Sequence, residues 1–179
     1  MSDVLPQSGL ILEIPEAEGA VGQHRNALDA NARLGVPAHF TVLFPFMAPV
    51  QIDSTVLTRL RQIFAGVRAF DVKLTHTAWF DDDVLWLAPE DPQPFRALTE
   101  LVYGAFPGFP PFAGQFPDVV PHLTIANGCD LTEMKAAERT VEELVPIRGC
   151  AREVTLMAQT EPGEAIWTKL ASFPLVGTP

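Results

Sequence analysis

The sequence predicts one α+β domain made of two similar lobes of mainly antiparallel sheet. A four-residue unit occurs twice, as His39-Phe40-Thr41-Val42 and as His122-Leu123-Thr124-Ile125. Two further pairs lie at nearly the same offset of about 82 positions: Leu74 with Leu156, and Trp86 with Trp167. We therefore expect residues 1–179 to form a single bilobal domain with an approximate internal repeat of residues 39–106 and 122–176.

Turn and capping residues divide the chain before residue 107 into alternating strands and helices. An N-cap at Asp53 or Ser54 begins the clearest helix, which carries one apolar stripe and ends near Gly66. The aspartates at 81–83 suit a hairpin turn better than a metal site, because a hard cation needs further oxygen ligands. In order, the predicted elements are a strand at 8–14, a helix at 16–33, the first His-x-Thr strand, a helix at 54–66, a hairpin at 70–80 and 84–87, and a helix at 94–106.

A segment rich in proline and phenylalanine, residues 107–121, separates the two halves and excludes regular structure. We interpret it as a connecting loop that lies over a cleft. After the second His-x-Thr strand, Asp130 is a suitable N-cap with Glu133 three residues on. The remaining predicted elements are a helix from 130 to about 145, a strand at 153–160, a turn at Pro162-Gly163 and a strand at 165–173. The order strand, helix, hairpin thus appears twice.

Composition and charge exclude several classes of protein. A hydrophobic content of 47% rules out a disordered polar chain, and 12 Lys and Arg against 22 Asp and Glu oppose binding to a long phosphate backbone. No apolar run approaches the roughly 20 residues that span a bilayer, and the N-terminus lacks a signal-like pattern. We therefore expect a cytoplasmic monomer that binds neither duplex nucleic acid nor a membrane, with Cys129 and Cys150 as free thiols.

The repeated unit offers one imidazole and one hydroxyl on the same face of a strand, because side chains alternate between faces. If a pseudo-two-fold axis relates the halves, His39 and His122 meet across a groove. One neutral imidazole then removes a proton from water while the other, as imidazolium, protonates the departing oxygen of a phosphoryl group. Thr41 and Thr124 can donate hydrogen bonds to the non-bridging phosphate oxygens. This chemistry requires no metal and no cofactor.

Other uses of the two histidines fit the sequence less well. A single His-x-Thr is a common accident and a strand histidine is more often structural, but a second copy at the repeat offset favours a catalytic pair. A zinc site is disfavoured, because two histidines without a Cys, Glu or Asp ligand at typical spacing do not complete a tetrahedron. We therefore expect no metal at this site.

With these two motifs, His39-Phe40-Thr41-Val42 and His122-Leu123-Thr124-Ile125, the chain resembles the two-histidine (2H) phosphoesterase superfamily, also called the 2′-5′ RNA ligase-like family. The resemblance implies a bilobal fold with outer helices around a central cleft that holds both His-Thr pairs. It also implies metal-independent opening of 2′,3′-cyclic phosphates or cleavage of 2′-5′ or 3′-5′ phosphodiesters. By the same resemblance His39 and His122 form the acid–base pair, and Thr41 and Thr124 bind the phosphate.

Several further residues are candidates for the cleft. We consider His76, Phe44 and Phe46 as possible lining residues, since an aromatic ring can stack on a nucleobase, although packing in the core is the usual role of each. His24 lies on an apolar helical stripe and is expected to be structural. Four cations are candidates for a phosphate contact, but the spacing selects none of them and each is expected to be a solvated surface charge: Arg25, Lys73, Arg152 and Lys169.

These observations favour a phosphodiesterase acting on the 2′,3′-cyclic phosphate or 2′-5′ linkage of a nucleotide or a short RNA end. The acidic composition disfavours an RNA 2′-5′ ligase, which would need basic residues beside the cleft. A nucleotide- or phosphate-binding module without turnover is the alternative from a different class. The near-symmetry of the two motifs leaves open which histidine is the base.

Overall fold

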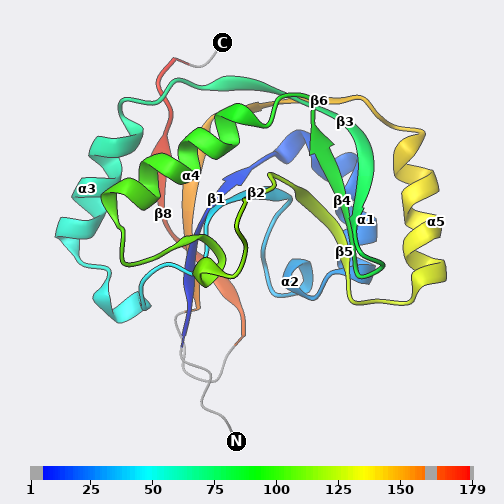
Figure 1. The fold of residues 1–179 in the computed structure, drawn as a ribbon, viewed down its shortest axis with the longest axis horizontal. Helices are drawn as coiled ribbons and strands as arrows, with labels where there is room; N and C mark the ends of the chain where they lie inside the picture. The colour runs from blue at the N-terminus through cyan, green and yellow to red at the C-terminus, as the bar shows by residue number, and fades with distance from the viewer. Residues whose placement is uncertain (1–5, 160–164, 178–179) are drawn as a thin grey trace, which may run out of the picture.

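Two four-stranded antiparallel sheets form the centre of the fold (Figure 1). The structure is a computed structural model and describes residues 6–159 and 165–177. The first sheet has the strand order β2-β1-β7-β8 and the second the order β5-β4-β3-β6. Every pair of neighbouring strands in both sheets is antiparallel. The predicted α+β class and the mainly antiparallel pairing are therefore confirmed.

The strands and helices follow one another in a largely alternating order. The strands are β1 (Ser8–Glu13), β2 (His39–Leu43), β3 (Phe70–Phe80), β4 (Val84–Pro89), β5 (Leu123–Asn127), β6 (Ile147–Ala151), β7 (Glu153–Gln159) and β8 (Trp167–Pro174). The α-helices are α1 (Glu18–Leu28), α2 (Ala30–Arg33), α3 (Ser54–Phe64), α4 (Gln93–Ala105) and α5 (Leu131–Glu142). Short 3-10 helices are η1 (Pro15–Ala17), η2 (Pro49–Gln51) and η3 (Pro111–Gly114).

Each sheet takes strands from both halves of the chain. The strand that carries His39, β2, shares its sheet with the C-terminal hairpin β7–β8, whereas β5, which follows His122, shares its sheet with the hairpin β3–β4. Position by position, β2 matches β5, β1 matches β4 and β7 matches β3. The repeat seen in the topology therefore begins at β1 and β4, ahead of the His-x-Thr units, and the two halves exchange their third strands.

Of the two further residue pairs noted in the sequence, the leucines lie on equivalent strands and the tryptophans do not. Leu74 and Leu156 lie in β3 and β7, which are the third strands of their sheets. Trp86 lies in β4, a second strand beside β5, whereas Trp167 begins β8 at the far edge of the other sheet. The tryptophan pair is thus a chance match, because the hairpin partner of β7 takes the outer position and the hairpin partner of β3 takes the inner one.

The helices cross from one sheet to the other and cover the apolar sides of the strands that carry the motifs. Helix α1 connects β1 to β2 of the first sheet but packs against β5 of the second, and α4 connects β4 to β5 but packs against β2. In Figure 1, α3 and α4 lie at one end of the molecule and α1 and α5 at the other. This exchange buries alternate residues of β2 and β5 and leaves their other faces for the site.

Local signals in the sequence placed most boundaries. Asp53 accepts a hydrogen bond from the backbone N–H of Val56, and Asp130 accepts from Thr132 and Glu133, as predicted for N-caps. The predicted hairpin at residues 81–83 is also present, and Asp81 adopts a left-handed φ of 48° in its turn. The predicted turn at Pro162-Gly163 lies outside the described residues.

Two predicted elements were wrong. The single helix expected at 16–33 is divided into η1, α1 and α2, because Asp29 is extended and uses its side chain to cap α2 at Asn31. The last helix ends at Glu142, and the chain then forms β6, which the sequence analysis missed. This five-residue strand, IRGCA, offers little alternation and contains a glycine, so its pattern does not resemble a strand.

The two cysteines agree with the expectation of free thiols. Cys129 is half-buried, Cys150 is buried, and both are free thiols. Across residues 6–159 and 165–177, the structure has no helix of the length and hydropathy needed to cross a bilayer.

The Asp130 cap provides a test of the β5–α5 connection. Substituting Asp130→Ala removes the acceptor of two backbone N–H groups and is expected to lower the free energy of unfolding by about 1 kcal/mol. The exposed Lys135→Ala in the same helix, which leaves the cap intact, serves as the control. Urea unfolding measures both, and equal stabilities of the two variants would contradict the assignment of Asp130 as the cap.

Candidate active site

Both His-x-Thr units lie at sheet edges that meet. Strands β2 and β5 are the outer strands of their sheets and contact one another. On one face of each unit the apolar residues are buried, Phe40 and Val42 in one strand and Leu123 and Ile125 in the other. The alternate residues, His39 with Thr41 and His122 with Thr124, are half-buried on the opposite face. The alternation expected from the sequence is therefore present in both units.

Each histidine is held by the same local hydrogen bond. Nδ1 of His39 lies 2.7 Å from the carbonyl oxygen of Pro37, and Nδ1 of His122 lies 2.7 Å from that of Val120. A carbonyl oxygen only accepts, so Nδ1 must carry the proton in both rings. The neutral tautomer therefore leaves Nε2 of each histidine free to accept or deliver a proton.

The surroundings lower the pKa of both histidines. Burial is the main cause and brings the pKa of His39 to about 4, against an opposing effect of the Pro37 carbonyl. The positive charge of Arg25 and the charge of His122 also lower the pKa of His39, whereas Asp29 raises it. Burial likewise lowers the pKa of His122, and its bond to Val120 acts in the opposite direction.

The hydroxyl of Thr41 lies close to the free ring nitrogen of His39. Its Oγ1 lies 3.5 Å from Nε2 of His39, at the outer limit of a hydrogen bond. A ligand oxygen that reaches this point can accept from the threonine hydroxyl while the imidazole nitrogen is also within reach. Thr124 has the matching place in the second unit, two residues after His122.

A pocket adjoins His39 and Thr41 on the face of the first sheet that carries them. Its volume is about 120 Å³, smaller than the ~300–1,000 Å³ that is usual for sites of drug-sized ligands. Phe44 and Trp167 meet edge-on in it, with ring centroids 6.0 Å apart. Gly9 makes room for Phe44, because a Cβ at this position would lie 3.0 Å from Cδ2 of the ring. The full lining is Gly9, Ile11, Asn31, Val36, His39, Thr41, Phe44, Met157 and Trp167.

Aromatic rings surround His122. Phe80 and Trp86 meet its ring edge-on at centroid distances of 5.0 Å and 6.0 Å. Trp86 is the cross-strand partner of Thr124, so the two side chains project from the same face of the sheet. Phe112 stacks on the histidine ring at 6.4 Å. The two histidines therefore have different neighbours, a pocket beside one and an aromatic wall around the other.

The proline-rich loop connects these two environments. The backbone N–H of Phe112 donates to the carbonyl of Phe44, just after β2, while the Phe112 ring contacts His122. Phe112 and Ala113 adopt left-handed φ values of 50° and 55°, followed by Gly114 at 72°. Non-glycine residues in this region are strained, and such strain is concentrated at functional sites. The loop thus joins the ends of both His-x-Thr strands, in line with the position interpreted from the sequence.

The other residues predicted to line the cleft lie at different depths. Phe44 lines the pocket beside His39. Phe46 does not; it is buried in the core against Phe106 and Phe109. His76 is exposed, with Nδ1 2.9 Å from Oγ1 of Thr75. His76 precedes Phe80 by four residues of β3, or about 13 Å of strand, which separates it from the ring of His122.

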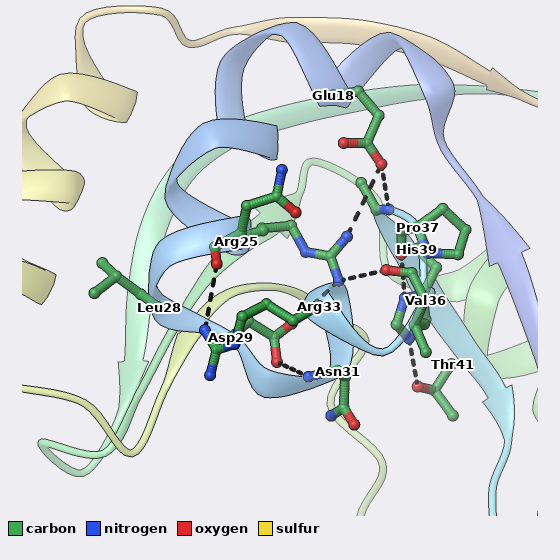
Figure 2. Close-up of polar contacts among 12 residues, drawn as sticks. Glu18, Arg25, Leu28, Asp29, Asn31, Arg33, Val36, Pro37, His39 and Thr41 are labelled. Atoms are coloured by element: carbon green, nitrogen blue, oxygen red, sulfur yellow. Dashed lines mark hydrogen bonds and ion pairs between the residues drawn. The ribbon is translucent and has the colours of Figure 1, made fainter. Parts of the chain in front are cut away.

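The four candidate cations are all engaged by carboxylates. Lys73 pairs with Glu90, Arg152 with Glu16, and Lys169 with both Glu13 and Glu153. Arg25 is also paired, with Asp29, but unlike the other three its side chain is buried, close to His39 (Figure 2). The expectation that Arg25 is a solvated surface charge was therefore wrong, and the reason lies in its position on the inner stripe of α1. Over the described residues, no group of three or more His, Cys, Asp or Glu is arranged to hold a metal ion.

Comparisons with known proteins agree with this arrangement. A family profile described as the 2′-5′ RNA ligase superfamily matches residues 14–163. Among solved structures, Escherichia coli LigT complexed with 3′-AMP superposes with a TM-score of 0.60 at 18% identity, covering 96% of this chain and 99% of that one. LigT complexed with NADP+ gives 0.57 at 18% identity, over 97% and 99% of the two chains. The protein TT0787 of Thermus thermophilus gives 0.59 at 15% identity, over 96% and 98%.

A search of curated protein sequences finds no significant match. At such low identities the structural likeness establishes the fold, whereas the profile covers most of the sequence, including both His-x-Thr units. The chain therefore belongs to the 2′-5′ RNA ligase superfamily, the two-histidine phosphoesterases.

Proposed function

We propose that the protein is a metal-independent phosphodiesterase that hydrolyses the 2′,3′-cyclic phosphate or 2′-5′ linkage of a nucleotide or a short RNA end. The observation that carries this proposal is the matched pair of Nδ1–carbonyl bonds at His39 and His122. They leave two Nε2 atoms free where two strand edges meet, and the Thr41 hydroxyl lies beside that of His39. These are the groups that phosphoryl transfer by acid–base catalysis requires.

The reaction needs one histidine neutral and the other protonated. The neutral Nε2 takes a proton from water as the water oxygen bonds to phosphorus. The bond from phosphorus to one ribose oxygen breaks, and the imidazolium Nε2 gives its proton to that oxygen. The products are a phosphate monoester on one ribose oxygen and a hydroxyl on the other. Thr41 and Thr124 donate to the non-bridging oxygens, whose charge grows in the transition state.

The lining of the pocket beside His39 offers contacts for a nucleobase. Phe44 and Trp167 offer ring faces for a base, and Asn31 adds an amide with both donors and an acceptor. The related LigT structures were solved with 3′-AMP, NADP+ and ATP, which are all adenine nucleotides. Together they support a nucleotide as the substrate unit of this chain.

Charge favours a small or terminal substrate over a long RNA. The net charge is −10, and Lys73, Arg152 and Lys169 are each already paired with a carboxylate. Binding along a phosphate backbone depends on free Lys and Arg that replace counterions. A ligase would use the same histidines with a ribose 5′-hydroxyl in place of water, but it would have to hold two such RNA ends.

Nucleoside 2′,3′-cyclic monophosphates incubated with the protein in excess EDTA test the reaction. Hydrolysis is expected in the wild type, with a loss of about 10²–10⁴-fold in kcat for His39→Ala and for His122→Ala, because each removes one proton-transfer group. Thr41→Val and Thr124→Val keep the side-chain shape and are expected to cost about 10²-fold. Product separation by chromatography measures all of these rates.

His76→Ala is the matched control, since His76 lies on β3 away from the His122 ring and should retain wild-type activity. Activity that requires metal, or that survives in the double variant His39→Ala/His122→Ala, would overturn the mechanism. Tight nucleotide binding without product would instead support a binding module. Joining of a 2′,3′-cyclic RNA end to a 5′-hydroxyl RNA would identify a ligase.

The pH dependence of kcat/KM is expected to be a bell displaced to acid pH. Below the lower pKa, about 4 at His39, both rings are charged and no base remains; above the pKa of His122, which lies below its ordinary 6.5, both are neutral and no acid remains. Activity should therefore be highest between pH 4 and 6.5 and fall as pH rises toward 8. A maximum above about pH 7 in initial rates at subsaturating substrate would contradict the effect of burial on these rings.

A further inference from the structure

Arg25 is buried where the helical stripe of α1 calls for an apolar residue. Its side chain is 2% exposed, and it is among the largest fully buried side chains of the protein. One guanidinium nitrogen, Nη2, donates to Oδ2 of Asp29 at 3.1 Å and to the carbonyl oxygen of Val36 at 3.1 Å. The other, Nη1, lies 3.9 Å from Oε1 of Glu18. A charge this deep is costly to bury unless it is paired, so its position calls for an explanation.

The contacts of Arg25 and Glu18 fix the short segment before His39 (Figure 2). Arg25 holds the Val36 carbonyl, and the Glu18 carboxylate accepts from the backbone N–H of Ala38 at 2.6 Å. Between these two anchors lies Pro37, whose carbonyl oxygen accepts the Nδ1 proton of His39. The carbonyl of Ala38 is also engaged, because it accepts from the N–H of Ile14. The direction of the Pro37 carbonyl, and with it the plane of the His39 ring, follows from these bonds.

The charges around His39 are unequal to those around His122. Facing His39 are Arg25, Asp29 and Glu18 from the side of α1 and α2, and His122, which precedes β5. Its cross-strand partner Glu13, on β1, is engaged by Thr155 and Lys169. The effect of Arg25 on the pKa of His39 exceeds the opposite effect of Asp29.

His122 has a different environment. Its ring contacts Phe80, Trp86 and Phe112, and burial with the Val120 bond accounts for its altered pKa. No charged group in the part of the chain that the structure describes is among the causes of this shift. The two motifs are nearly symmetric in sequence, but the charges around their histidines differ.

We propose that Arg25, paired with Asp29, is a positioning residue for His39, which orients the ring through Val36 and Pro37 and disfavours a second positive charge there. His39 is then the general base and His122 the general acid. The assignment of roles rests on the proposed phosphodiesterase reaction, whereas the effect of Arg25 on the state of His39 does not.

The double variant Arg25→Met/Asp29→Asn tests the charge. It removes both members of the buried pair together, and asparagine retains the capping of α2 at Asn31. The titration of His39 is followed by NMR in substrate-free protein, with its resonance assigned by its absence from His39→Ala. The His39 pKa is expected to rise, because the lowering effect of Arg25 exceeds the raising effect of Asp29, and the acid limb of the kcat/KM profile should move upward with it while the alkaline limb stays in place.

Two further variants separate charge, orientation and general destabilisation. Arg25→Lys keeps the positive charge but cannot bridge Asp29 and Val36 with a planar fork, so the His39 titration should be nearly unchanged while kcat falls about 10-fold. Arg33→Met is the matched control, because Arg33 donates to the carbonyls of Asn26 and Ala27 on the same helix end. It should leave both the titration and kcat unchanged.

The results for these variants test the role of Arg25 separately from the proposed phosphodiesterase activity. An unchanged His39 titration in Arg25→Met/Asp29→Asn, or wild-type kcat in Arg25→Lys, would overturn the role of Arg25. If the double variant does not fold, the kcat of Arg25→Lys against that of Arg33→Met still decides it. Movement of the alkaline limb in place of the acid limb would make His39 the acid. Absence of hydrolysis in the wild type would reject the proposed function, while the NMR titration would still test Arg25.

Discussion

The hydrogen bond from each histidine to the carbonyl two residues before it is the constraint on which the site depends. It occupies Nδ1 of His39 and of His122 and so directs all proton transfer to Nε2. A bond between residues this close in sequence is set by the local strand geometry, which explains why the two copies match. The rest of the fold has to bring two such strand edges together and to keep their apolar alternates in the core.

That requirement is met by exchange between the halves. Helix α1 leaves the first sheet to cover β5, and α4 leaves the second to cover β2. Each motif strand is therefore buried on its apolar face by a helix that belongs, in sequence, to the other motif. The symmetry of the framework ends at the environment of the rings, where one side has a buried ion pair and the other a set of aromatic side chains.

Patterns of short range made much of this structure predictable. Alternation identified the faces of both motifs, and the N-caps at Asp53 and Asp130 fixed two helix starts. Helical periodicity was less decisive in α1, where the buried stripe includes Arg25 and not His24. Arg25 was expected to be a solvated surface charge, although Asp29 stands four residues later, at the spacing of an ion pair. The prediction that Phe46 lines the cleft was wrong, because nothing in the neighbouring sequence distinguishes a ring in the core from a ring in a cleft.

The pairing of strands was beyond such patterns. A hairpin signal says which strands are joined by a turn, but not which member of the hairpin lies inside the sheet. Both strands of the β3–β4 hairpin lie inside their sheet, with the later one beside β5, whereas in the β7–β8 hairpin the later strand is at the edge. The pairing of strands that lie far apart in the sequence decides which strand is inside. For this reason the internal repeat expected from the sequence does not begin at the same strands as the repeat in the topology.

The exchange of third strands also has a consequence for synthesis of the chain. The sheet that contains His39 needs residues of β7 and β8, which are translated after the other described strands. Until then β1 and β2 have only each other, and a two-stranded ribbon is not stable alone in water. The first motif, although translated early, is thus completed last, and a nascent chain stalled before β7 exposes apolar strand edges to chaperones or to aggregation.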